Sequence, residues 1–194
     1  MYKALSALVF IVLFLSGCSG MRVVDSQVNS FAPAPVPAGS RYSFERLPSQ
    51  QNNSGAQDQL EAMAEDALTK VGLVRDDQAA SYSVQVSVTQ RAEQSALDYP
   101  GLGWNLGWRM GNGGVAMGRG PLFPGLDVRT SYWREVGLVI RKRSTQAVVF
   151  ESHASHDGPW ADSDAVLPAM FDAALQGFPE PPSGVRRVNI EIAR

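Results

Sequence analysis

The side chain best suited to covalent chemistry is that of Cys18, the only cysteine in the sequence. It follows two small residues at the end of an apolar run over residues 4–15, and a lysine precedes that run. A charged start, a short apolar stretch and small residues before a cleavage point are typical of a secretory signal peptide. The run is too short for a membrane-spanning helix, which needs about 20 residues. We therefore predict that residues 1–17 are a signal peptide.

The four residues Leu15-Ser16-Gly17-Cys18 closely resemble the lipobox of bacterial lipoproteins. The resemblance implies that Cys18 receives a thioether-linked diacylglycerol, that cleavage occurs before it, and that its new amino group is acylated, palmitate being the expected chain. Two or more acyl chains give stable membrane attachment. Ser19 stands where lipoproteins retained at the inner membrane carry an aspartate, so the resemblance favours the periplasmic face of an outer membrane. The alternative is an ordinary secreted protein with a chance cysteine.

The remaining chain is predicted to form a lipidated tether, residues 18–21, and one domain, residues 22–194. Because Cys18 is the only cysteine, the mature chain has no internal disulfide, and its core alone must hold it together. A lipidated Cys18 also leaves no thiol for a cysteine nucleophile or a cysteine-ligated metal.

The charge balance argues against a nucleic-acid partner. Seventeen basic side chains face 19 acidic ones, for a formal net charge of −2. So mild an imbalance predicts neither a nucleic-acid footprint nor a polybasic membrane surface. Gly101-x-Gly103 and Gly113-Gly114 lack the spacing of a phosphate-binding loop. We therefore predict no cofactor.

The two histidines, His153 and His156, are the remaining candidates for catalysis or metal binding, with Asp157 beside them. Both lie in or next to an expected strand, in which residues of odd and even number point to opposite faces. We predict surface or structural histidines, no metal site, no catalytic residues and no enzymatic activity. A hydrolase that uses His153 and Asp157 is the alternative.

The longest irregular segment, residues 100–125, holds nine of the 18 glycines together with large apolar side chains. Long loops inside a compact domain are usually functional or disordered. Exposed tryptophan and methionine suit a membrane interface or a protein partner. The segment is therefore either a loop without a specific role, a lid over a pocket, or a contact surface for lipid or protein. The candidate contact residues are Trp104, Trp108, Met110, Met117 and Phe123.

Hydrophobic periodicity predicts eight elements. Two helices, between residues 54 and 72 and between 163 and 177, show apolar residues at i, i+3, i+4, i+7, i+8 and i+11. The first is expected to end in a left-handed Gly72 cap, and Ser163 or Asp164 can cap the second. Alternation of apolar and polar residues predicts the strands, over residues 22–28, 41–47, 81–89, 132–141, 147–153 and 185–192.

The resulting order is β-β-α-β-β-β-α-β. Alternating strands have one buried and one solvated face, which favours a mostly antiparallel sheet over a parallel one. We predict an α+β domain in which two amphipathic helices pack on one face of that sheet.

The stretch Tyr132–Ile140, the hairpin that follows it to Ser152, and the closing run Phe171–Pro179 resemble domain-of-unknown-function family 4136, a family of bacterial lipoproteins. The similarity covers residues 23–179. It implies no established activity and no catalytic residues, and this chain adds a strand after the family's usual end.

These observations favour a non-enzymatic envelope lipoprotein that contacts the membrane through its anchor and an envelope protein as a further partner. The oligomeric state is left open. The alternative is a carrier or transport-auxiliary subunit that binds a lipid or small ligand behind the glycine-rich loop.

Overall fold

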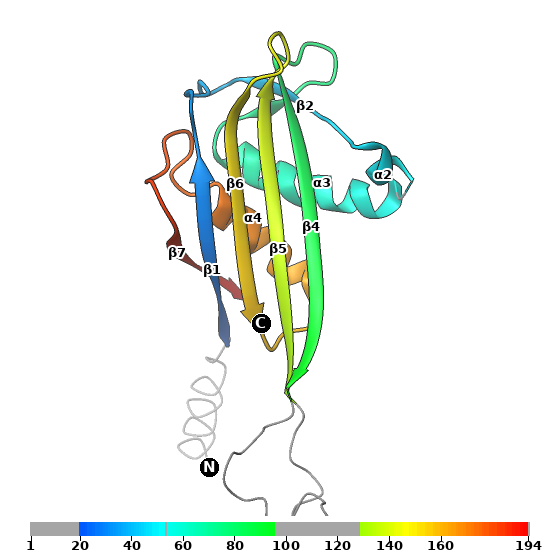
Figure 1. Ribbon diagram of the computed structural model, residues 1–194, viewed down its shortest axis with the longest axis vertical. Coiled ribbons are helices and arrows are strands. Elements are labelled where there is room, and N and C mark those ends of the chain that lie inside the picture. Colours follow the sequence, from blue (N-terminus) through cyan, green and yellow to red (C-terminus); the bar gives the residue numbers. More distant parts are fainter. Residues whose placement is uncertain (1–19, 53, 96–128, 194) are drawn as a thin grey trace, which may run out of the picture.

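The computed structural model describes residues 20–52, 54–95 and 129–193, which form one seven-stranded sheet with helices on one side (Figure 1). Cys18 and all of the predicted contact segment 100–125 lie outside these ranges. The elements follow in the order β1 (Met21–Phe31), β2 (Arg41–Phe44), α2 (Pro48–Gln51), α3 (Ser54–Lys70), β3 (Val74–Arg75), β4 (Tyr82–Ser95), β5 (Arg129–Lys142), β6 (Val148–Gly158), α4 (Ser163–Ala174) and β7 (Arg186–Ala193).

The predicted α+β class and the predicted order of elements are confirmed. The strands are arranged β3-β2-β4-β5-β6-β1-β7, and every pairing is antiparallel except those of β2 with β3 and with β4. Two short elements were not predicted, α2 and the two-residue β3. β4 also continues to Ser95, beyond the predicted end at Thr89. Its last residues are polar on both faces, so alternation does not reveal them, and only their pairing with β5 holds them in the strand.

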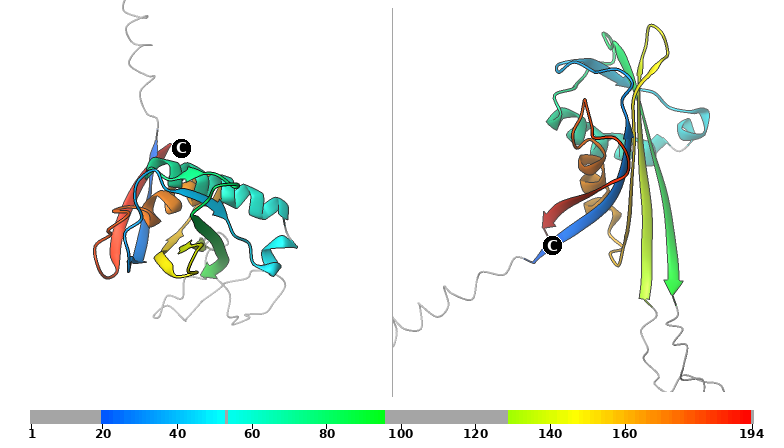
Figure 2. Two further views of the ribbon diagram at one scale, coloured as in Figure 1. Left: turned by 90° about the horizontal axis from the view of Figure 1, so that it is seen from above. Right: turned by 60° about the vertical axis from the view of Figure 1, so that its left-hand side comes forward.

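The inner face of the sheet carries the apolar half of each alternating strand, and α3 and α4 cover it (Figure 2). The stripe of α3 that the sequence predicts to be buried includes Leu60, Ala64 and Leu68, and all three are buried. On the sheet side they meet residues such as Val86 and Leu138, which are 1% and 0% exposed. The opposite, outer face carries polar residues such as Gln85, Glu135 and His153, and neither α3 nor α4 lies over it (Figure 2).

The ends of the two main helices follow from their sequences. Gly72 has a φ of +86° and its N–H bonds to the carbonyl of Thr69, while the N–H of Leu73 bonds to Leu68 at 3.0 Å. This is the glycine cap that the sequence predicts. The cap prediction for α4 is wrong, because Asp162 rather than Ser163 or Asp164 occupies the N-cap position.

The register of the four central strands brings three distant points of the chain to one end of the sheet. Gln27, Ser155, Glu135 and Thr89 form one row across β1, β6, β5 and β4. Six residues from this row, in the same direction, lie Met21 at the start of β1, Arg129 at the start of β5 and Ser95 at the end of β4. We call this end of the sheet the Met21 end (Figure 1).

Candidate functional site

At the Met21 end the described chain stops close, in sequence, to both of the sites predicted from the sequence, Cys18 and the glycine-rich segment. Cys18 lies three residues before Met21, so an extended tether between them spans at most about 10 Å. Trp104, Trp108, Met110, Met117 and Phe123 fall between Ser95 and Arg129, outside the described residues. The strands on either side of that segment, β4 and β5, respectively end and begin at the Met21 end.

A row of polar side chains interrupts the core on the inner face near this end. Gln90, Arg134 and His156 are cross-strand neighbours on β4, β5 and β6, and Ser26 on β1 is a further buried polar residue. The next inward-facing row, one step further from the Met21 end, is entirely apolar and includes Val136 and Ala154. The polar row was not predicted. The signal was available in Arg134, which falls in the same alternating set as Val136, Leu138 and Ile140.

Arg134 is the most unusual member of the row, because it is a guanidinium only 1% exposed. Its Nε donates to Ser163 Oγ at 3.1 Å, and one terminal nitrogen donates to the Trp160 carbonyl at 2.9 Å. A weaker bond of 3.4 Å reaches the Tyr132 carbonyl. Burial lowers the pKa of Arg134, and within the described ranges none of its hydrogen bonds reaches a carboxylate. Arg134 therefore ties the loop before α4 to the sheet through neutral oxygens.

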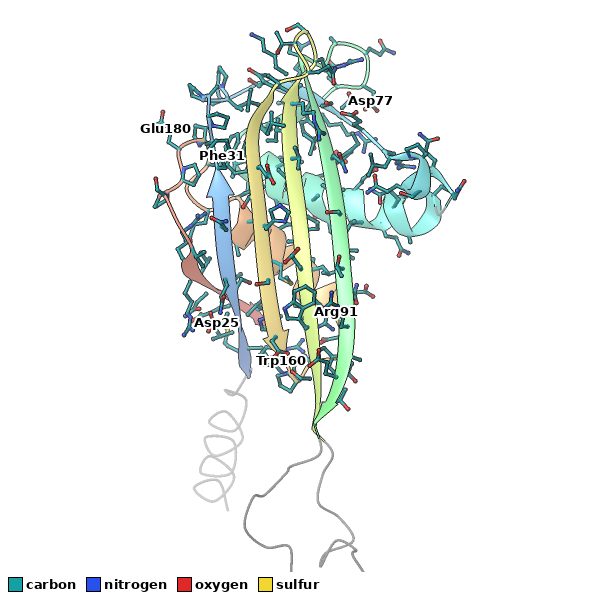
Figure 3. The ribbon with its side chains drawn as sticks, viewed as in Figure 1. Asp25, Phe31, Asp77, Arg91, Trp160 and Glu180 are labelled. Carbon is teal, nitrogen blue, oxygen red and sulfur yellow. The ribbon has the colours of Figure 1, made fainter. Side chains whose placement is uncertain are left out.

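Arg22 and Asp162 form a second contact beside this row. The two terminal nitrogens of Arg22 meet the two carboxylate oxygens of Asp162 at 3.0 and 2.9 Å. This bidentate pair draws the N-cap side chain toward β1, and Asp162 makes no side-chain cap bond to α4. The Arg22 guanidinium also lies 5.6 Å from the centre of the Trp160 ring, which is labelled in Figure 3.

The histidines point to opposite faces, as the sequence predicts. His156 lies in the inner-face row, where it is 4% exposed, and its Nδ1 donates to the Asp25 carbonyl at 2.8 Å. His153 lies on the outer face and meets Glu151 at 3.1 Å. No group of three or more His, Cys, Asp or Glu side chains within the described ranges is placed to hold a metal ion.

The outer face has a shallow hollow of about 300 Å³ near the Met21 end. Trp133 lines it, with the Arg91 guanidinium 5.0 Å from the centre of its ring (Figure 3). Asp25 and Asp157 also line it, but Arg187 pairs with Asp25 at 3.4 Å and Ser131 donates to Asp157. Both carboxylates of the hollow thus already have a partner within the protein.

A family model described as "Domain of unknown function (DUF4136)" matches residues 25–180, most of the chain. The chain belongs to the DUF4136 family. The match confirms the resemblance drawn from the sequence. The DUF4136 region runs from β1 past the end of α4 and includes Arg134 and Asp162, while β7 follows it. No curated protein matches the sequence.

Several solved structures are similar to this DUF4136 protein. A PDZ domain protein from Parabacteroides distasonis is 14% identical with a TM-score of 0.51, which shows a shared fold; the match covers 94% of this chain and 41% of that one. The PelC dodecamer from Paraburkholderia phytofirmans is 14% identical (TM-score 0.46, covering 80% of this chain and 99% of that one). A minor lipoprotein from Acinetobacter baumannii is 13% identical (TM-score 0.36, covering 71% and 87%).

None of the helices in the described part of the chain is long and apolar enough to cross a bilayer.

The Arg22–Asp162 pair predicts a dependence of stability on pH. Hydrogen bonds from Arg22 hold the pKa of Asp162 below its ordinary value. Such a carboxylate stabilises the fold above its unfolded pKa, about 3.9, and the contribution is lost as pH falls through the folded pKa. We expect Asp162→Ala to be less stable than wild type at neutral pH, with the difference in unfolding free energy shrinking between about pH 5 and pH 2.

Urea denaturation across that pH range measures the effect. Asp164→Ala, which removes an exposed carboxylate from the first turn of the same helix, is the matched control. A difference between Asp162→Ala and wild type that stays constant down to pH 2 would show that the ion pair does not stabilise the fold.

Proposed function

We propose that this protein is a lipid-anchored lipoprotein of the bacterial envelope that acts as a non-enzymatic interaction module at the membrane surface. The observation that carries the proposal is the sequence Leu15-Ser16-Gly17-Cys18 after a short apolar run. Cys18 holds the lipid, and Ser19 favours the periplasmic face of the outer membrane. Its membership of the DUF4136 family agrees with this proposal, since the sequence resemblance is to a family of lipoproteins.

The short tether supports a membrane-facing role for the Met21 end. β1 begins at Met21, so at most about 10 Å of chain separates the lipid from the folded sheet. β4 and β5 are each 14 residues long, which corresponds to about 46 Å at roughly 3.3 Å per residue. The basic turn around Lys142 and Arg143 lies at their opposite end, far from the proposed anchor.

The segment between Ser95 and Arg129 supplies the proposed contact. β4 ends and β5 begins at the Met21 end, which is the end of the sheet that we propose faces the bilayer. Tryptophan is enriched at membrane interfaces because its ring is apolar and its N–H is polar. We assign the membrane surface as the first partner of this segment, with an envelope protein as the further one.

A non-enzymatic role is favoured by the partners of the polar groups. His156 donates to a backbone carbonyl, and Arg134 and Asp162 both position α4. The hollows of about 300 and 260 Å³ lie at or below the small end of the range for ligand pockets. We therefore propose an interaction module rather than a carrier of lipid.

Lipidation predicts a specific defect in a Cys18→Ser variant. Wild-type protein expressed in a diderm bacterium should incorporate labelled palmitate and be processed to begin at residue 18. Cys18→Ser should carry no label and keep residues 1–17, because the thioether can no longer form. Ser19→Ala is the control and should behave as wild type. The lipoprotein assignment would be overturned if wild-type protein incorporated no labelled palmitate, or if the Cys18→Ser variant were still cleaved before residue 18.

If the segment contacts the membrane, brominated lipid should quench its tryptophan fluorescence, and replacing those tryptophans should remove the quenching. Lipidated full-length protein in vesicles of brominated phosphatidylcholine should show tryptophan fluorescence quenched by the lipid. A variant carrying both Trp104→Ala and Trp108→Ala should lose most of that quenching, whereas Trp133→Phe on the outer face should retain it. Equal quenching in the double variant and in wild type would remove these two residues from the membrane contact.

A further inference from the structure

We infer that the hollow between the N-terminus of α4 and the β4–β5 ladder is a binding site for a phosphate group, with Arg134 as its central cation. The hollow has a volume of about 260 Å³. Arg134 lines it together with Gln90, Ala92 and Tyr132 from the strands, Ala161 lines it from the loop before α4, and Ser163 lines it from the first residue of the helix. It lies beside the N-terminus of α4 near the Met21 end, and the outer-face residues Arg91 and Trp133 also line it, Trp133 being shared with the hollow on the outer face.

The charges of the side chains around the hollow are not fully balanced, which favours an anion. Arg134 and Arg22 carry two positive charges, and Asp162 is the carboxylate that lies beside them. Asp162 is held at 2.9 and 3.0 Å by Arg22, whose own buried Nε has no partner among the described residues. Arg134, at 1% exposure, has only neutral acceptors. Since burying a charge is costly unless it is paired, this cluster favours one additional negative charge.

The N-terminus of α4 adds donors on the other side of the same hollow. α4 has 12 residues, and its N-cap side chain makes no cap bond because Arg22 draws it away. The N–H groups of the first turn, starting at Ser163, are therefore left for another acceptor. Such N–H groups, aligned with the helix dipole, are a common seat for phosphate. Asp164 in that turn is exposed.

The side chains of the hollow complete a donor set for several oxygens. Ser163 Oγ accepts from Arg134 and donates to Gln90 Oε1 at 3.0 Å, which leaves the Gln90 amide N–H groups available. The side chains of Arg134 and Gln90 and the start of α4 thus border one hollow. Several donors from different directions suit the multiple oxygens of phosphate, and charged hydrogen bonds from arginine are the strong ones. The phosphate could belong to a phospholipid headgroup or be free in solution.

A substitution that places a carboxylate inside the hollow tests this site, because the carboxylate would take the place of the phosphate. Gln90 is the direct cross-strand partner of Arg134, so Gln90→Glu provides the missing negative charge inside the hollow. The matched control is Gln85→Glu on the same strand. Gln85 accepts a hydrogen bond from Arg141 at 3.1 Å on the outer face, so the same chemical change occurs beside an arginine away from the hollow.

Isothermal titration of the lipidated full-length protein in maltoside micelles, at constant ionic strength, measures the binding. The titrants are sodium phosphate and dihexanoylphosphatidylglycerol below its micelle concentration, with sodium chloride as blank. We expect saturable binding of at least one phosphate compound, weakened about tenfold or more by Gln90→Glu and unchanged within about twofold by Gln85→Glu. Binding of the lipid alone assigns a headgroup, and binding of inorganic phosphate assigns a free anion.

Two results would overturn the inference: no binding of either titrant to wild type, or binding to Gln90→Glu as tight as to wild type. Circular dichroism checks that the variants are folded. If Gln90→Glu does not fold, Ala92→Glu replaces it, because Ala92 is exposed at the rim of the same hollow and its carboxylate would repel phosphate there. The phosphate site is inferred only from residues that the structure describes, so a negative result would contradict this inference without bearing on the proposed lipid anchor.

Discussion

The continuous register of β1, β6, β5 and β4 is the constraint on which the rest of the structure depends. These strands share the row of Gln27, Ser155, Glu135 and Thr89, and from this row the start of β1, the end of β4 and the start of β5 all lie in the same direction. A shift of one residue in any of these pairings would turn apolar side chains outward. Burial of the inner face by α3 and α4 thus fixes this register, and the direction of β1 places Met21 at the end of the sheet where β4 ends and β5 begins.

The inner face changes character along this axis. Under the helices it is an apolar core of residues such as Leu138 and Phe150, whereas near the Met21 end it becomes the polar row that includes Arg134 and His156. Arg134 holds the loop before α4 against the sheet, and Arg22 holds Asp162 against β1. Arg134, one of the two guanidiniums that position α4, also lines the hollow at its N-terminus. Structural anchoring of the helix and the proposed phosphate site therefore share one cause.

Much of this architecture could be predicted from periodicity, because alternation and helical spacing are local signals. The six predicted strands, the two helices and the opposite faces of His153 and His156 follow from them. β3 could not be predicted, since two residues carry no period and their pairing with β2 is set by the turn after α3. The polar row was missed for a different reason. Arg134 meets Ser163 and Trp160 only through the fold, and no local pattern joins β5 to the start of α4.

The orientation of the sheet on the membrane is the central claim, and spin labels test it most directly. The only native cysteine is proposed to be lipidated, so Glu93→Cys and Thr145→Cys each provide one labelling site at opposite ends of the long β-strands. With the protein anchored in vesicles, the label at residue 93 should collide readily with a lipid-bound relaxation agent, and the label at residue 145 should not. Equal accessibility of the two labels, or the reverse order, would contradict the account.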